Sequence, residues 1–259
     1  MATGQNFTIV ITRPSHQADN LYHTISNEGG HPLLFPTLAI TEPPDPTALT
    51  ISINKLDVFD KIVFLSPNAV DYSAAKIKAR WPTLPARLQF LAIGAGTTVA
   101  LIKAGLPAAI CPASDFSSEG LLALPALQAT SIQSQHILLV HGVGGRTVLA
   151  ETLTQRGAHV AHAITYQRIP LHPDPQPVLA AWQAGQIYAT VITSQESLTQ
   201  FVEILRGPLQ NHLQEMPLLV ISERLAAFAR SIGFKRLFIA QNASDEAIVA
   251  ALIEGKRSI

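Results

Sequence analysis

The sequence repeats its own plan once, at an offset of 128 residues, as from Ile9 to Ile137. Shifting the chain by that distance brings identical residues together at equivalent places of equivalent segments. The aligned pairs include Leu21 with Leu149, Gly29 with Gly157, His31 with His159, Val63 with Val191, Ser66 with Ser194, Ile93 with Ile221 and Gly105 with Gly233. A period this long excludes a solenoid, whose repeats are about 20–50 residues long. The chain is therefore predicted to contain two copies of one structural plan.

Each copy alternates short apolar runs with amphipathic segments. The apolar runs predict strands at residues 7–12, 61–65, 90–93, 108–111, 137–140, 190–193, 218–221 and 236–239. Segments with helical periodicity lie at residues 19–27, 97–104, 147–155, 195–205 and 225–231, and several are followed by a glycine. Short, almost wholly apolar strands are typical of parallel sheets buried on both faces. The alternation predicts an α/β fold with doubly wound parallel sheets.

Prolines cluster at nearly equivalent places in the two copies. One group is Pro36, Pro43, Pro44 and Pro46, and the other is Pro170, Pro173, Pro175 and Pro177. Proline lacks a backbone N–H and disfavours helix at the residue before it, so both stretches are predicted to be extended connectors. Two such connectors suggest that the chain crosses between domains twice, with residues 61–168 in one domain and both chain ends in the other. Two sequential domains are the alternative, because the pattern alone does not separate the two arrangements.

Composition narrows the class of protein. Of the 259 residues, 47% are hydrophobic and 14% are charged, which excludes a disordered chain. The 18 Lys and Arg balance the 18 Asp and Glu, so no overall positive field would attract nucleic acid. A single cysteine, Cys111, cannot form an internal disulfide or a thiolate metal site. The sequence shows neither a secretory leader nor an apolar stretch of about 18 residues, so we expect a cytosolic, soluble protein.

Small polar residues follow the predicted strands. In doubly wound sheets, ligands bind beyond the carboxyl ends of the strands, where helix N-termini present free N–H groups. The residues at these places include Thr12, Ser66, Asn68, Gly94, Thr97, Ser194 and Ser222. Arg13, Arg146 and Arg224 add guanidinium groups that match carboxylates. This set predicts binding of several carboxylates, and plain helix capping by Ser and Asn is the alternative at each position.

Familiar nucleotide and metal motifs are incomplete in this chain. The Gly94-Ala95-Gly96 turn lacks the third glycine of a dinucleotide loop, and the turn at 142–145 lacks the Gly-Lys-Ser/Thr ending of a P-loop. His159 and His162 are three residues apart on a predicted strand, so their side chains face opposite sides and form no metal pair.

Tyr166 lies where the second copy enters its proline segment. A phenol at this place could donate a proton to a departing hydroxyl, which makes Tyr166 a candidate general acid. The alternative is an amphipathic aromatic side chain that anchors the connector.

The order of these segments resembles the uroporphyrinogen-III synthase family. The matching motifs are Val10-Ile11-Thr12-Arg13-Pro14, Val63-Phe64-Leu65-Ser66-Pro67-Asn68-Ala69-Val70, Ile93-Gly94-Ala95-Gly96-Thr97, Gly145-Arg146, Gly157, Tyr166-Gln167-Arg168, Thr193-Ser194 and Ile221-Ser222. Each motif is short, and their order and spacing over almost the whole chain carry the resemblance.

The resemblance implies two flavodoxin-like α/β domains joined by a two-stranded linker, with an active-site cleft between them. The implied domains are residues 1–36 with 172–259, and residues 38–169. The implied activity is that of a lyase in haem biosynthesis, which removes water from the linear tetrapyrrole hydroxymethylbilane and closes the ring with inversion of the last pyrrole. No metal or cofactor is implied. We expect a cytoplasmic monomer that contacts hydroxymethylbilane synthase transiently, with no nucleic-acid or membrane partner.

The resemblance also assigns roles to residues. Tyr166 matches the tyrosine proposed to assist departure of the hydroxyl, and is the expected catalytic residue. The expected substrate-binding residues are Arg13, Ser66, Asn68, Gly94, Thr97, Arg146, Ser194, Ser222 and Arg224. The chain departs from the family at Leu225, where many members carry a threonine that donates a hydrogen bond. Ser222 or Arg224 is our candidate to replace that donor.

Two other classes of protein fit parts of the pattern. A noncatalytic two-domain binding protein would close on a small anionic ligand, and a nucleotide-dependent transferase would share the fold. The missing leader disfavours a periplasmic binding protein, and the incomplete phosphate loops disfavour the transferase. Product analysis separates a binding protein from the enzyme, because hydroxymethylbilane left alone closes to the uninverted type I isomer.

Overall fold

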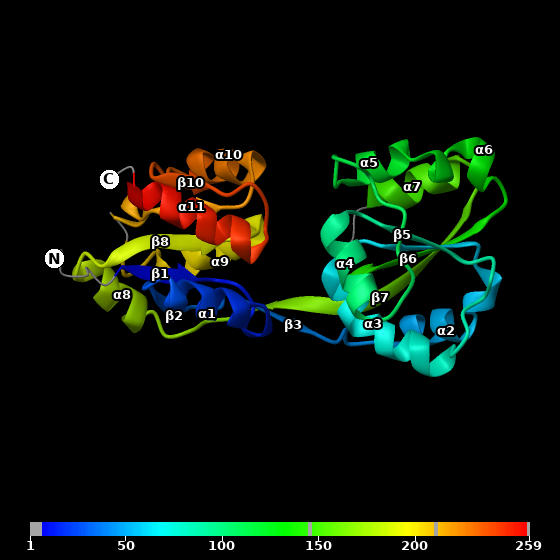
Figure 1. Cartoon of the computed structure of the whole chain (residues 1–259), viewed down its shortest axis with the longest axis horizontal. Coiled ribbons are helices and arrows are strands. Elements are labelled where there is room, and N and C mark those ends of the chain that lie inside the picture. The colour runs from blue at the N-terminus through cyan, green and yellow to red at the C-terminus, as the bar shows by residue number, and fades with distance from the viewer. Residues whose placement is uncertain (1–6, 145–146, 210–211, 258–259) are drawn as a thin grey trace. The chain divides into compact units, whose positions relative to one another are not determined.

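The computed structural model describes residues 7–144, 147–209 and 212–257, and the chain divides into two compact units (Figure 1). Unit 1 comprises Met1–Ala39 and Ile169–Ile259, and unit 2 comprises Ile40–Arg168. Both boundaries fall inside strands, β3 (Leu38–Thr41) and β7 (His159–Pro170), which are neighbours in one sheet. The chain therefore passes between the units twice.

Unit 1 contains a five-stranded sheet with the order β10-β9-β8-β1-β2, in which every neighbouring pair is parallel. Its strands are β1 (Thr8–Ile11), β2 (His31–Leu34), β8 (Ile187–Ile192), β9 (Leu218–Val220) and β10 (Leu237–Ile239). Its helices are α1 (Asp19–Asn27), α8 (Gln176–Gln183), α9 (Gln195–Leu205), α10 (Glu223–Ser231) and α11 (Asp245–Arg257). Val10 packs into a core with residues of α8, α9 and α10, whereas Ile9 and Ile11 pack against α1 and α11. Both faces of the sheet are buried.

Unit 2 contains a five-stranded sheet with the order β3-β7-β6-β4-β5. Besides β3 and β7, its strands are β4 (Lys61–Phe64), β5 (Gln89–Ala92) and β6 (His136–Gly142), and the pairs from β7 to β5 are parallel. Its helices are α2 (Thr47–Asn54), α3 (Pro67–Arg80), α4 (Ala95–Lys103), α5 (Ser118–Ala123), α6 (Ala129–Ile132) and α7 (Thr147–Gln155). Ile62 and Phe64 pack toward α2, α3 and α4, and Val63 packs toward α5, α6 and α7. The doubly wound α/β fold with parallel sheets is thereby confirmed.

The two sequence copies are exchanged between the units. The offset of 128 residues relates β1 and β2 to β6 and β7, and relates β4 and β5 to β8 and β9. Unit 1 therefore combines the first two strands of the first copy with the last three of the second, and unit 2 combines the complementary strands. Both sheets keep the same order of equivalent strands. The repeat is thus a repeat of strand–helix segments, and neither copy forms a unit alone.

Two expectations need correction. The strand expected at 108–111 is reduced to a single bridge between Ile110 and Leu91, because Pro107 and Pro112 remove backbone donors on either side. The proline clusters are only partly extended: α2 begins directly after Pro46, and Pro177 lies in the first turn of α8. Proline fits the first helical turn, where the N–H has no partner within the helix. None of the helices in the described part of the chain has the length and apolarity needed to cross a membrane.

Candidate active site

At one edge of the unit 2 sheet, the ends of β4, β5 and β6 and the middle of β7 bring predicted residues together. Ser66 follows β4, Gly94 follows β5, Gly142 ends β6, and Tyr166 lies on β7 opposite Gly142. Ser66 is the N-cap of α3, and its Oγ accepts a hydrogen bond from the Ala69 N–H at 3.1 Å. Parallel register thus places residues that are 100 positions apart in the chain next to one another.

The Tyr166 phenol is the centre of this group. Its Oη lies 3.1 Å from Ser66 Oγ, and the Arg168 guanidinium donates to it at 3.2 Å. The Arg168 guanidinium also lies over the phenol ring, 5.4 Å from its centroid, and the Tyr72 ring lies 6.1 Å away. The residue as a whole is 3% exposed, while Ser66 is half-buried and Arg168 exposed. The ring is therefore held in the core, and its hydroxyl meets one half-buried and one exposed side chain.

Arg168 is a site residue that the sequence did not single out. It is part of the motif that carried the family resemblance, but a lone arginine in a proline-bounded strand gives no sign of its contacts. The contact with Tyr166 could have been predicted from the spacing, because residues two apart on a strand lie on the same face of the sheet.

The other predicted residues of unit 2 have different surroundings. Asn68 lies half-buried in the first turn of α3. Gly94 is the N-cap of α4, and the Phe116 ring packs so closely on it that a Cβ there would lie 2.9 Å from ring carbons. Thr97 is 2% exposed, so its hydroxyl faces the interior of unit 2. Arg146 lies outside the described residues.

A small pocket lies at the carboxyl ends of β8 and β9 in unit 1. It is lined by Thr193, Ser194, Gln195, Ile221, Ser222, Arg224 and Leu225. Ser194 caps α9 by accepting from the Ser197 N–H at 3.0 Å, and Ser222 caps α10 by accepting from the Leu225 N–H at 3.3 Å. The helix-capping alternative is therefore observed at both serines. Each hydroxyl proton nevertheless stays available as a donor, because the cap uses only the oxygen's lone pair.

Leu225 contributes its backbone to this pocket and its side chain to the core. The side chain is 6% exposed and packs in the apolar cluster formed by α9, α10 and β9. Arg224 is exposed at the pocket rim, next to Ser222. The pocket thus holds two hydroxyls, the N-termini of two helices and one guanidinium, a combination suited to a carboxylate.

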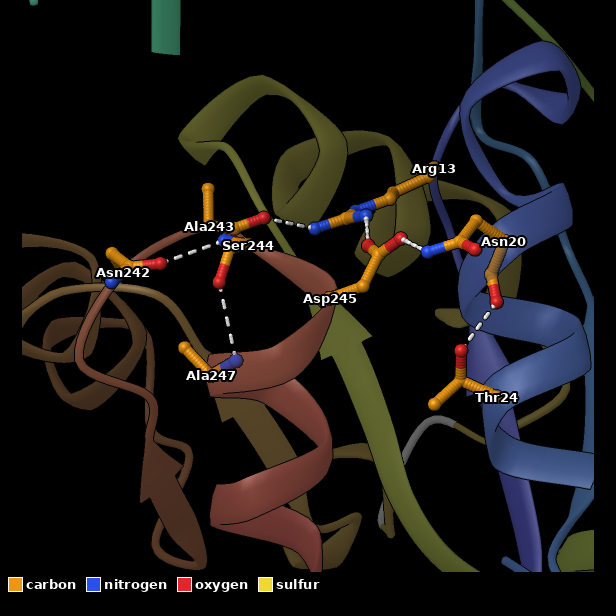
Figure 2. Close-up of polar contacts among 8 residues, drawn as sticks. All are labelled: Arg13, Asn20, Thr24, Asn242, Ala243, Ser244, Asp245 and Ala247. Carbon is orange, nitrogen blue, oxygen red and sulfur yellow. Dashed lines mark hydrogen bonds and ion pairs between the residues drawn. The ribbon is translucent and has the colours of Figure 1, made fainter. Parts of the chain in front are cut away.

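Arg13 has a protein partner at the carboxyl end of β1 (Figure 2). Its guanidinium forms an ion pair with Asp245 at 2.5 Å and donates to the Ala243 carbonyl, and Asn20 donates to the second Asp245 oxygen at 2.6 Å. The residue is 9% exposed. Arg13 therefore joins β1 and α1 to the start of α11. Arg13 lies at the strand end, as expected. Its guanidinium is already paired with the Asp245 carboxylate.

Histidines form two contacts across β6 and β7. His136 and His159 stack with ring centroids 4.8 Å apart, and His141 Nε2 lies 2.9 Å from His162 Nδ1. The spacing of His159 and His162 along one strand does not reveal these pairs across two strands. Within the described residues, no three His, Cys, Asp or Glu side chains gather as a metal site.

The stability of unit 2 should decrease as the pH is lowered, because of His162. His162 is an exposed residue whose ring is partly buried against His141. This partial burial, and secondarily the neighbouring His141, lower the pKa of His162 below its ordinary 6.5. The unfolded chain then binds the proton more readily, so stability is present above about pH 6.5 and is lost as pH falls toward the folded pKa. We expect the Tm to drop further between about pH 7.5 and about pH 5.5 in the native chain than in His162→Gln. Equal pH slopes in thermal scans of the two proteins would contradict this.

A family model and curated relatives match almost the whole chain. The model described as uroporphyrinogen-III synthase HemD matches residues 19–250. Uroporphyrinogen-III synthase of Escherichia coli is 32% identical over 249 residues, which cover 95% of this chain and 99% of the relative. Uroporphyrinogen-III synthase of Salmonella typhimurium gives the same identity and coverage.

Solved structures with the same fold carry the same name. A mutant uroporphyrinogen III synthase of Thermus thermophilus matches with a TM-score of 0.63 and 19% identity, covering 98% of this chain and all of the other. Uroporphyrinogen-III synthetase of Helicobacter pylori matches with a TM-score of 0.56 and 15% identity, covering 96% and 99%. These matches show the shared fold.

Proposed function

The chain belongs to the uroporphyrinogen-III synthase family, and on that premise we propose that it converts hydroxymethylbilane into uroporphyrinogen III. The reaction removes the terminal hydroxyl of a linear tetrapyrrole as water, inverts the last pyrrole ring and closes the macrocycle. We assign the departure of the hydroxyl to Tyr166 and the binding of carboxylates to the ends of the parallel strands.

The observation that carries the catalytic assignment is the pair of contacts at the Tyr166 oxygen. Ser66 Oγ accepts from the Ala69 N–H, so its own proton can be donated to the phenol oxygen 3.1 Å away. Arg168 donates to the same oxygen. Both lone pairs of the phenol oxygen are then occupied, and the phenol proton is left to donate to a ligand. A hydroxyl that departs next to Tyr166 takes that proton.

The protons balance over the reaction. Transfer from Tyr166 turns the departing hydroxyl into water as its C–O bond breaks, and the pyrrole nitrogen stabilises the cationic carbon left behind. Ser66 and Arg168 stabilise the negative charge on the phenol oxygen. The cationic carbon bonds to the substituted α-carbon of the last pyrrole and forms a spirocycle, and the bond from that α-carbon to its old bridge carbon then breaks. The freed bridge carbon bonds to the other α-carbon of the same ring, which loses its proton, and that proton restores Tyr166. The net change is the loss of one water.

Positioning supplies the rest of the catalysis. Hydroxymethylbilane carries eight carboxylates and closes by itself to the uninverted isomer, so the protein has to hold it in the conformation that leads to inversion. The pocket of Ser194, Ser222 and Arg224 is suited to one of these carboxylates. Arg13 is the weaker candidate of the predicted cations, since Asp245 already pairs with it.

Removing the donors of this pocket should weaken substrate binding. We expect Ser222→Ala to raise KM by about tenfold, because a hydrogen bond to a charged group contributes about 1.5 kcal/mol or more. Arg224→Ala should raise KM by about threefold, since an exposed ion pair contributes under about 1 kcal/mol. Steady-state kinetics of each variant check this, with Arg206→Ala, an exposed arginine at the C-terminus of α9, as the matched control. An unchanged KM in both variants would reject the pocket as a carboxylate site.

Product analysis tests the function itself. Porphobilinogen is supplied with its deaminase, this protein is added, and the cyclic isomers are separated by chromatography. The type III isomer is expected. The type I isomer alone would leave a noncatalytic binding protein for a small anion, an alternative that the named relatives do not favour.

The substrate is unstable in solution, so the enzyme that makes it should deliver it directly. Because free hydroxymethylbilane closes to the wrong isomer, a short path from the enzyme that makes it is an advantage. The proposal therefore includes a cytoplasmic monomer that contacts hydroxymethylbilane synthase transiently.

A further inference from the structure

The ladder between β6 and β7 contains an irregularity next to Tyr166. Residues pair one to one from His136 with His159 up to His141 with Ile164, and the register then shifts so that Gly142 pairs with Tyr166. Thr165 is the extra residue. Its hydroxyl donates to the His141 carbonyl at 3.2 Å, and its side chain is fully buried. A bulge of this kind redirects the following side chain, here that of Tyr166.

Gly142 gives the Tyr166 ring its place. A Cβ at position 142 would lie 2.5 Å from two ring carbons, which leaves room only for glycine. The Val143 N–H donates to the Tyr166 carbonyl at 2.8 Å, so ring and backbone of Tyr166 are both held at this turn of the chain. Any rotation of the Gly142 peptide would move the surface on which the ring rests.

The His141 side chain holds that peptide. Its Nδ1 lies 2.7 Å from the Gly142 carbonyl oxygen, and because a carbonyl only accepts, Nδ1 carries the hydrogen. In the neutral ring Nε2 is then an acceptor, and it faces His162 Nδ1 at 2.9 Å. His141 is 9% exposed, so both ring nitrogens of a buried side chain have partners. The Gly142 carbonyl thus fixes the tautomer of His141, and Nε2 of the neutral His141 ring accepts from His162 Nδ1.

We propose that His141 is a positioning residue for Tyr166. By donating from Nδ1 to the Gly142 carbonyl, it fixes the bulge that keeps the phenol oxygen within reach of Ser66 and Arg168. The inference rests on the proposed role of Tyr166 in the reaction. When this hydrogen bond is lost, the phenol oxygen moves away from Ser66 and Arg168, and its proton is no longer directed to the substrate. The carboxylate-binding groups do not move.

Three substitutions at one position test the role of Nδ1. His141→Asn puts an amide N–H at the place of Nδ1, His141→Gln puts one near Nε2, and His141→Leu removes both. We expect Asn to keep kcat within about threefold of the native value, and Leu and Gln to lower it by about tenfold or more with little change in KM. His159→Asn, on the paired strand β7 and away from the bulge, is the control and should leave kcat unchanged. If the Leu variant does not fold, the kcat of the Gln variant compared with that of the Asn variant still tests the role of Nδ1.

A double-mutant cycle with Tyr166→Phe separates this inference from the proposed function. If His141 acts through Tyr166, then adding His141→Gln to Tyr166→Phe lowers kcat no further. Additive losses, a folded His141→Gln protein with native kcat, or an Asn variant as slow as the Gln variant would each overturn the inference while Tyr166→Phe stays impaired. Native kcat in Tyr166→Phe would instead reject the role of Tyr166, and the positioning role with it.

Discussion

Replacing Tyr166 by Phe should lower kcat by about a hundredfold with KM nearly unchanged. General acids contribute about 10²- to 10⁴-fold, and the lower end applies here because the substrate stabilises its own cation. Phe keeps the ring on Gly142 and beside Tyr72, so the fold around it stays intact. Steady-state turnover of hydroxymethylbilane with separation of the product isomers measures the effect.

Tyr72→Phe is the matched control. The Tyr72 hydroxyl donates to the Ile40 carbonyl at 2.8 Å, and the Tyr72 ring lies beside that of Tyr166. The Tyr72→Phe variant therefore also removes one phenol oxygen from the same core. It should keep kcat within about twofold. A Tyr166→Phe protein as fast as the Tyr72→Phe protein would contradict the assignment of the acid.

Replacing Asp245 by Ala should lower the free energy of unfolding of unit 1 by about 3 kcal/mol. The side chains of Arg13 and Asp245 are only 10% and 17% exposed, so removing the carboxylate leaves a largely buried guanidinium without its counter-charge. The Asn20 amide loses its acceptor at the same time (Figure 2). Urea denaturation followed by circular dichroism measures the change.

The double variant Arg13→Met with Asp245→Leu is the control for that loss. Apolar side chains of similar volume often replace a buried ion pair at little cost, so this protein should recover most of the stability that Asp245→Ala loses. An Asp245→Ala protein within about 0.5 kcal/mol of the native chain would show that the pair is effectively solvated. A double variant with native KM would show that Arg13 binds no substrate carboxylate.

Much of the fold follows from local sequence signals. The periodicity predicted α1, α7 and α9 with their observed bounds. The apolar runs placed β1, β4, β5, β6, β8, β9 and β10 to within three residues, because parallel strands covered on both faces are apolar throughout. They did not include β2, β3 or β7, whose residues are more polar or more exposed. The helix α3 was missed although Ser66 and Pro67 form a clear start signal, since both were considered only as a strand end. The exchange of strands between copies could not be predicted from the repeat, because strand pairing is set by contacts far apart in the chain.

The candidate site was predictable in its residue types and less so in its contacts. Serines after apolar strands marked helix N-termini at one edge of each sheet, and Ser66, Ser194 and Ser222 indeed lie there. The partner of Arg13 is 232 residues away, at the start of a helix that no local pattern connects to β1. The role of His141 depends on a one-residue shift in register, which periodicity cannot reveal.

The most direct measurement is a crystal structure with an unreactive hydroxymethylbilane analogue that keeps the terminal hydroxymethyl group. We expect its hydroxyl oxygen within about 3.2 Å of Tyr166 Oη, the distance that proton transfer requires, and a carboxylate among Ser194, Ser222 and Arg224. A bound analogue whose hydroxyl lies farther from Tyr166 than one bridging water can span would contradict the assignment.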